Sequence, residues 1–174
     1  MRSGVELFLS EEAIELHKEY LRTLKYRYSI LEKSFPEING LALQLIAKIR
    51  HNYKDETLSL KTEILCHELF FNSFGSSYQS SLAVKKWYGS EAAFLYEVFN
   101  ICKSSSAPFL IINKERGRVN VNLIKETTQL LKIAKPLLAI DLCEHAYFLD
   151  YGFDREGYLN NLLPRINLAI LDNF

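Results

Sequence analysis

The most informative part of the sequence is Pro136–Tyr151, which reads P-L-L-A-I-D-L-C-E-H-A-Y-F-L-D-Y. An apolar run of strand length opens it, and Asp141 and His145 follow that run four residues apart. Carboxylate and imidazole groups are ligands that transition ions accept. The stretch therefore predicts a buried strand that ends in two candidate metal ligands.

Two more histidines stand on predicted helices earlier in the chain. A serine N-cap followed by two glutamates begins a predicted helix over 10–33, with His17 on its buried stripe. A second helix is predicted over 41–52, and a third over 57–71 carries His67 on an apolar face. Each histidine alone also fits a hydrogen-bonded core position. Three imidazoles with one carboxylate, however, form a set that can coordinate a transition ion inside a fold.

The pattern changes in the second half of the chain. Residues 81–102 favour helix with a break at 88–90, and short apolar stretches at 109–112 and 119–121 flank a turn in which Gly117 can supply a positive φ. With the apolar run at 136–140 these stretches predict a small three-stranded antiparallel sheet, and a final helix is predicted over 154–171.

This order predicts an α+β fold, in which an N-terminal helical hairpin precedes a half built from the sheet and further helices. We expect a hairpin region at 1–76 and an α/β region at 77–174, with the candidate site between them. No internal repeat or linker interrupts the 174 residues.

Composition narrows the classes of function. The 21 basic and 21 acidic residues cancel, so no global field draws the protein to nucleic acid or to an anionic membrane. No apolar run approaches the length of a membrane span, and a cytoplasmic location with no membrane partner is expected. Three irregularly spaced cysteines, Cys66, Cys102 and Cys143, predict reduced thiols.

Several motifs together resemble the iron/manganese superoxide dismutases. Residues 136–151 are similar to the family signature P-L-L-x-x-D-V-W-E-H-A-Y-Y-x-D-Y. L-S-E-E-A-I-E-L-H resembles the helix that ends in the family's first ligand, His17 here, and H-E-L-F-F-N resembles the motif of the second ligand, His67. The resemblance implies one iron or manganese ion per subunit, held by His17, His67, Asp141 and His145 with a solvent molecule.

The resemblance also marks where this chain departs from the family. Lys25 stands at the position of a tyrosine that gates substrate and helps to deliver protons, and Glu63 at that of a glutamine that hydrogen-bonds the metal's solvent. Because those two family side chains touch, an opposite-charge pair of Lys25 and Glu63 is expected, with a proton-relay role. Two separate, solvated charges are the alternative. The family's tryptophans and guiding arginine are replaced too, at Leu65, Ala107, Cys143 and Gly152.

The family forms dimers in which the Glu of W-E-H reaches the ligand histidine of the other subunit. Glu144 and His145 retain that pair, whereas a second family bridge falls on the apolar Leu21 and Phe148. A homodimer bridged by Glu144 is therefore expected.

The leading functional hypothesis is an oxidoreductase that disproportionates superoxide to oxygen and hydrogen peroxide, with altered or reduced activity. One alternative is a different redox or oxygen chemistry with Glu63 near the ion. Another is a non-catalytic superoxide dismutase-like subunit of a larger assembly. Iron and manganese both accept this ligand set, so the sequence leaves the choice of metal open.

Overall fold

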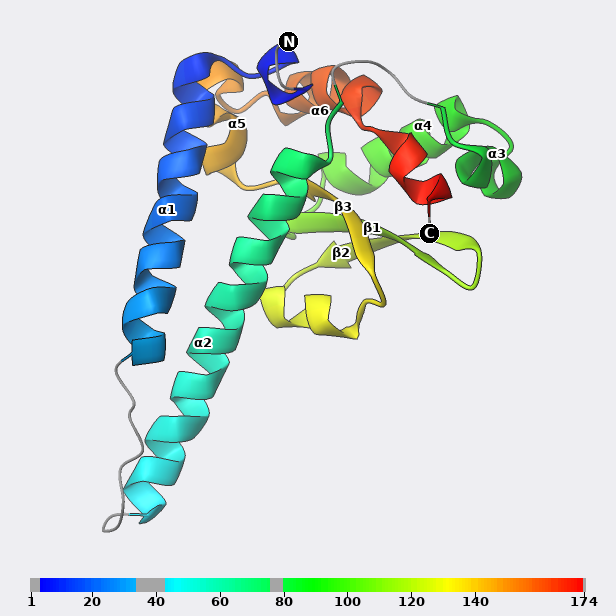
Figure 1. The fold of residues 1–174 in the computed structure, drawn as a ribbon. Coiled ribbons are helices and arrows are strands. Elements are labelled where there is room, and N and C mark those ends of the chain that lie inside the picture. Colours follow the sequence, from blue (N-terminus) through cyan, green and yellow to red (C-terminus); the bar gives the residue numbers. More distant parts are fainter. Residues whose placement is uncertain (1–3, 34–42, 76–79, 174) are drawn as a thin grey trace.

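Two long helices form the N-terminal part of this computed structural model, which describes residues 4–33, 43–75 and 80–173 (Figure 1). Helix α1 (Glu11–Lys33) and helix α2 (Leu43–Asn72) run antiparallel and pack side by side. A short 3-10 helix, Gly4–Leu7, precedes α1. The predicted helical hairpin is confirmed.

The start of α1 follows from its capping residues. The hydroxyl of Ser10 accepts the backbone N–H of Ala13 at 3.1 Å, and the N–H of Ser10 itself donates to the carboxylate of Asp150 at 2.7 Å. A serine in this position satisfies an amide that the helix leaves without a partner. Because Asp150 belongs to the C-terminal half, this hydrogen bond holds the start of α1 against that half.

Helix α2 corrects one prediction. The sequence predicted two helices with an end near residues 51–52, whereas the helix runs without interruption from Leu43 to Asn72. The polar residues around the expected end include neither proline nor glycine, and such residues lower helix propensity only slightly. Polarity alone therefore did not end the helix.

The next two helices meet at the predicted break. Helix α3 (Leu82–Tyr88) ends at Gly89, which has a φ of 77°, and helix α4 (Glu91–Lys103) restarts with Ser90 as its N-cap. The positive φ is easily adopted by glycine, and the serine hydroxyl accepts the N–H of Ala93 at 3.1 Å.

The sheet has the order β2-β1-β3 and is antiparallel throughout. Strands β1 (Phe109–Glu115) and β2 (Arg118–Ile124) form a hairpin whose two turn residues, Arg116 and Gly117, have φ of 50° and 81°. This combination is typical of the turn that suits twisted hairpins. Strand β3 (Pro136–Asp141) lies on the other side of β1. The predicted α+β class is confirmed.

Edge strand β3 is covered by the end of α2. The buried hydroxyl of Ser73 accepts the N–H of Ala139 at 2.8 Å and donates to the carbonyl of Leu69 at 2.7 Å. The carbonyl of Ser73 accepts the N–H of Asn167 at 2.8 Å. One residue thus ties the helix to the strand and to the C-terminal segment.

The C-terminal region departs from the expected single helix over 154–171. After α5 (Glu144–Tyr151), helix α6 spans only Arg155–Leu162, and short 3-10 turns at Leu163–Arg165 and Leu168–Asp172 follow. Pro164 explains the end, because proline has no N–H and its ring disfavours a continuing helix. Another 3-10 turn, Thr127–Lys132, joins β2 to β3 and was not predicted.

Over the residues described, one apolar cluster fills the space between the sheet and the surrounding helices. It includes the fully buried Phe70, Phe94, Leu110, Ile111 and Ile140. Among the residues that the structure describes, no helix has both the length and the apolarity needed to cross a membrane.

Candidate metal centre

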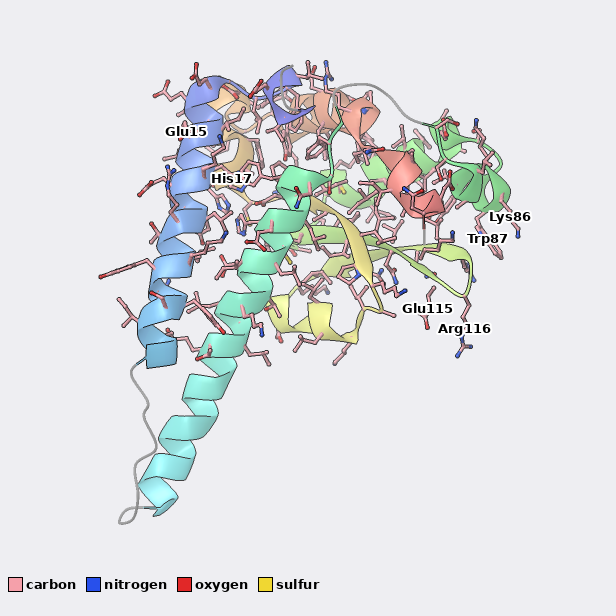
Figure 2. The ribbon with its side chains drawn as sticks, in the orientation of Figure 1. Glu15, His17, Lys86, Trp87, Glu115 and Arg116 are labelled. Atoms are coloured by element: carbon pink, nitrogen blue, oxygen red, sulfur yellow. The ribbon has the colours of Figure 1, made fainter. Side chains whose placement is uncertain are left out.

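The four predicted ligands converge from four elements. His17 comes from α1, His67 from α2, Asp141 from the end of β3, and His145 from the first turn of α5. Oδ2 of Asp141 lies 3.2 Å from Nε2 of His17, 3.4 Å from Nε2 of His67 and 3.3 Å from Nε2 of His145. Figure 2 labels His17 where it lies between α1 and α2. Residues 128 positions apart in the sequence thus meet at one point, between the hairpin and the sheet.

The spacing of these donor atoms fits a single ion. Four ligand atoms at about 2.1 Å from a common centre, in tetrahedral directions, would lie about 3.4 Å from one another. The distances to Asp141 are close to this value, and the Nε2 atoms of His67 and His145 are 3.1 Å apart. One ligand atom from each of the four residues can be chosen so that all lie within 4.8 Å of one another.

Unpartnered polar atoms point to the same conclusion. Both ring nitrogens of His17 and Oδ2 of Asp141 are buried and accept or donate no hydrogen bond. Buried polar atoms are nearly always partnered, so an orphaned carboxylate oxygen facing imidazole nitrogens indicates a missing partner. A cation accepts lone pairs from all of these groups, and the residues present therefore fit a metal ion.

The orientation of His67 is set by its own helix. Its Nδ1 lies 2.8 Å from the backbone carbonyl of Glu63, one turn earlier in α2. A carbonyl can only accept, so Nδ1 carries the proton and the lone pair of Nε2 faces the other ligands. Burial lowers the pKa of His67 below its usual value, although the charge of Asp141 opposes the shift. The imidazole is therefore neutral at pH 7, the form that binds metals.

Asp141 is held by hydrogen bonds on both its carboxylate and its backbone. Its Oδ1 accepts the N–H of Cys143 at 2.8 Å, and its carbonyl accepts the hydroxyl of the fully buried Tyr158 at 3.0 Å. Burial would raise the pKa of Asp141, but the neighbouring imidazoles of His145 and His17 outweigh it and hold the pKa below its usual range. The group is an anion at neutral pH, ready to balance the charge of a cation.

Arg155 supports the turn that follows Asp141. Its guanidinium donates to the carbonyls of Leu142 and Ser105 and, at 3.2 Å, to the hydroxyl of Tyr147. Three bonds in different directions make the turn rigid, since the planar guanidinium holds its donors in a fixed fork. The arginine thereby fixes the geometry of the last two ligands.

The structure corrects the predicted Lys25–Glu63 pair. Lys25 lies 2.7 Å from Glu68, and both side chains of that pair are about half exposed, 49% and 43%. Glu63 instead accepts the hydroxyl of Tyr20 at 2.8 Å. The physical reason is hydration: a lysine ammonium remains at the surface, where it keeps water, rather than moving to a half-buried carboxylate.

Sequence reasoning missed Tyr20. Its ring lies over His145, with 4.4 Å between centroids, and 5.4 Å from the ring of His67. Burial and the hydrogen bond to Glu63 raise its pKa well above the usual value, so its phenol is a donor. The signal was available, because residues three apart on a helix share a face, which puts Tyr20 beside His17.

Two other residues of interest flank the centre without joining it. The four-residue donor cluster found in the described part of the chain does not include Cys143, whose thiol lies 3.7 Å from the carbonyl of Pro108. Glu144 is exposed beside His145, the one ligand with an accessible side chain, at 28%. A shallow cavity of about 270 Å³ borders them, lined by Leu16, Glu144, His145, Phe148 and Leu149.

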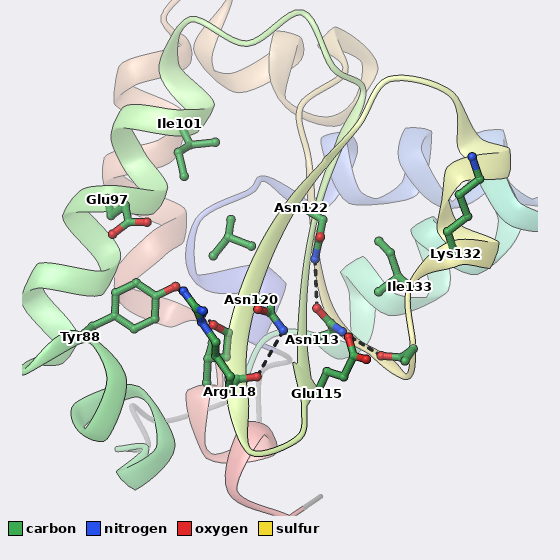
Figure 3. Close-up of a pocket in the computed structure, with 13 residues that line it drawn as sticks. Tyr88, Glu97, Ile101, Asn113, Glu115, Arg118, Asn120, Asn122, Lys132 and Ile133 are labelled. Atoms are coloured by element: carbon green, nitrogen blue, oxygen red, sulfur yellow. Dashed lines mark hydrogen bonds between the residues drawn. The ribbon is translucent and has the colours of Figure 1, made fainter.

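A larger polar cavity, of about 430 Å³, lies elsewhere in the molecule, between α4, the β1–β2 hairpin and the segment before β3 (Figure 3). Its floor is a chain of amides: Asn122 donates to Asn113 at 3.0 Å, and Asn113 donates to the carbonyl of Ala134 at 2.9 Å. Glu97 and Glu115 balance Arg118 and Lys132 around it. None of the predicted site residues lines this cavity.

Three imidazoles and one carboxylate, gathered between a helical hairpin and a small α+β half, define a candidate single-ion centre. The sequence model described as "Iron/manganese superoxide dismutases, C-terminal domain" matches residues 75–173, and the chain belongs to this family.

Curated relatives agree with that assignment. The chain is 29% identical over 173 residues to "Superoxide dismutase [Fe]" of Bordetella pertussis, with 91% of this chain and 86% of the relative covered. It is 27% identical over 177 residues to "Superoxide dismutase [Fe]" of Aquifex aeolicus, with 94% and 83% covered. The similarity thus extends over nearly the whole chain, the hairpin included, at low identity.

Proposed function

We propose that this chain is an oxidoreductase that disproportionates superoxide to oxygen and hydrogen peroxide, with one iron or manganese ion held by His17, His67, Asp141 and His145. The observation that carries the proposal is the convergence of these four donors: the three Nε2 atoms lie 3.2 to 3.4 Å from Oδ2 of Asp141, and all four ligand atoms lie within 4.8 Å of one another. An iron or manganese ion bound there would supply the one-electron redox chemistry that the disproportionation of superoxide needs.

The protein's own groups prepare the site for that chemistry. The carbonyl of Glu63 fixes the tautomer of His67, and the N–H of Cys143 fixes one oxygen of Asp141, so the other oxygen faces the three imidazoles. A single carboxylate among neutral imidazoles leaves a bound cation with net positive charge, which attracts an anion. Apolar walls exclude water from three of the four ligands, whose side chains are fully buried.

The surroundings favour a slow enzyme. Glu63 places a second carboxylate near the ligand rings, and it repels superoxide and lowers the net positive charge of the site. The proton-relay role expected for Glu63 stays a prediction of the sequence, and we propose that the effect of its charge on the rate is the larger of the two. We expect dismutation below the diffusion limit.

The proposal is tested by metal content and dismutase activity of the full chain after loading with iron or manganese. About one ion per chain and measurable activity that disappears in His67→Ala are expected. Stoichiometric metal without activity would favour a different redox chemistry. Substoichiometric metal with a stable partner protein would favour the structural-subunit alternative. Activity near the diffusion limit would contradict the expected effect of Glu63.

We further propose a homodimer in which Glu144 of each chain reaches His145 of the other. The support is local: Glu144 is exposed, His145 is the accessible ligand, and Leu16, Phe148 and Leu149 form an exposed apolar surface around them, at 52%, 45% and 49%. We also propose that 1–76 and 77–174 are two regions that share the ion. A cytoplasmic location stays a prediction of the sequence.

A further inference from the structure

One side of the candidate centre is closed by a side chain that supplies no ligand. Tyr20 follows His17 by three residues on α1, and its ring is tilted by 31° over the ring of His145. The same ring lies 5.4 Å from His67. Tyr20 itself is 36% exposed, so it stands between solvent and two of the four ligands.

The phenol of Tyr20 also anchors the nearest additional carboxylate. Its hydroxyl donates to Oε1 of Glu63 at 2.8 Å, which joins α1 to α2 at the level of the ligands. Glu63 precedes His67 by one helical turn, so its side chain is on the same face as that ligand. A hydrogen bond to an ionised acceptor is stronger than one between neutral groups, and it restrains the carboxylate.

From this geometry we propose that Tyr20 is the cover and positioning residue of the centre. Its ring shields His145 and His67 from solvent, and its hydroxyl holds Glu63 outside the set of ligands. Without the hydroxyl, Glu63 is free to turn toward a bound ion and add a fifth protein donor. The inference rests on the proposed metal centre, and it does not depend on dismutase activity.

Two substitutions separate the role of the ring from that of the hydroxyl. Tyr20→Phe keeps the ring and removes the donor, whereas Tyr20→Ala removes both. Tyr26→Ala on the same helix is the matched control, because Tyr26 is 66% exposed and has no ring contact with a candidate ligand among the contacts described. Each full-length variant is loaded with Co²⁺, whose visible absorption bands change with the number and type of its ligands.

The ring is tested by the rate at which a chelator removes Co²⁺. Loss of one well-packed aromatic contact can change the affinity for the ion by up to about tenfold. We expect removal from Tyr20→Ala to be about tenfold faster than from wild type, while Tyr20→Phe and Tyr26→Ala stay within about twofold. Equal rates for Tyr20→Ala and Tyr26→Ala, at equal thermal stability, would overturn the role of the ring.

The hydroxyl is tested by the Co²⁺ spectrum. Tyr20→Phe is expected to shift the visible bands, and the shift is expected to vanish when the same change is made in Glu63→Met, where no carboxylate can turn inward. A spectrum unchanged by Tyr20→Phe, or a shift that persists without Glu63, would overturn the positioning role. Wild-type protein that binds no Co²⁺ would instead contradict the metal centre itself, and the cover with it.

Discussion

At the scale of single residues, the centre depends on one carboxylate among three imidazoles. Asp141 is completely buried, its Oδ1 is occupied by the N–H of Cys143, and its Oδ2 faces three Nε2 atoms. An isolated buried charge is costly, whereas a charge that neutralises a cation is favourable. The residue is therefore better explained as a metal ligand than as a structural acid.

Asp141→Asn removes that charge while it keeps the shape of the side chain. Because even residues behind the ligands typically affect metal affinity by 10- to 100-fold, loss of the charged ligand should weaken Mn²⁺ binding by at least about 100-fold. Isothermal titration measures the change. Glu156→Gln, at an exposed acid of α6, is the control and should bind like wild type. Comparable affinities in the two variants would contradict the assignment of Asp141.

The buried imidazole of His67 makes the stability of the metal-free protein depend on pH. Burial lowers its pKa in the folded state, so the unfolded chain, with a histidine pKa of about 6.5, binds more protons in the window below that value. Stability should therefore fall as the pH drops from 7.5 to 5.5. Urea denaturation checks this, and His67→Phe should lose part of the dependence. An unchanged slope in that variant would count against a neutral, buried His67.

Glu63→Gln tests the charge that we hold responsible for a slow reaction. Removing one negative charge near the site should raise the dismutation rate by about three- to tenfold, and the gain should shrink as salt is added. Stopped-flow decay of superoxide measures it. The matched change Glu19→Gln alters an exposed acid of α1 that bonds to Arg22, and it should leave the rate unchanged.

At the scale of elements, Ser73 connects α2 to the edge strand that ends in Asp141. Ser73→Ala leaves the N–H of Ala139 without its partner in a buried site, which costs about 1–3 kcal/mol of unfolding free energy. Chemical denaturation measures the loss. Thr23→Ala removes an exposed hydroxyl that bonds only within α1, so its effect should stay within about 0.5 kcal/mol. Equal stabilities of wild type and Ser73→Ala would show that the N–H of Ala139 has another hydrogen-bond partner.

Much at this scale could be predicted from local signals. Ser10, Ser90, Gly89 and Gly117 act within a few residues, so a cap, a break and a turn can be recognised without knowledge of the fold. The length of α2 could not be predicted from the polarity of residues 51–52, because the absence of proline and glycine mattered more. Pro164 is a local signal of the same kind, because proline cannot continue a helix, and the predicted helix over 154–171 is wrong at that residue.

In the candidate site, the ligands could be predicted because sequence motifs mark them. The side-chain contacts between α1 and α2 could not. The resemblance named all four ligands, and the structure brings them together. The partners of Glu63 and Lys25 depend on side-chain direction and hydration, which the sequence does not contain. Tyr20 was missed because it occupies no position that the family motif marks.

At the scale of the whole molecule, the hairpin and the α+β half depend on each other. The hairpin supplies His17 and His67, and the other half supplies Asp141 and His145. Contacts such as Ser10 to Asp150, at 2.7 Å, join the same two halves at the end of the hairpin. A bound ion is therefore expected to stabilise the assembled molecule, since only the folded chain gathers the ligands.

Phe148→Glu tests the proposed homodimer. Phe148 is 45% exposed beside Glu144, and a charge in a self-complementary apolar contact is repeated on both copies, so dissociation is expected. Light scattering should give twice the chain mass for wild type and the chain mass for the variant. Tyr96→Glu, which changes a 70% exposed residue of α4, should leave the dimer intact. Wild type that is monomeric at all concentrations would contradict the proposal.

Anomalous X-ray scattering would show whether one ion is held by His17, His67, Asp141 and His145. Crystals of the manganese- or iron-loaded protein would be measured on both sides of the metal's absorption edge. We expect a single strong peak per chain, at about 2.0–2.2 Å from Nε2 of each histidine and Oδ2 of Asp141. A fully loaded protein with its peak elsewhere, or with none at these four residues, would contradict it.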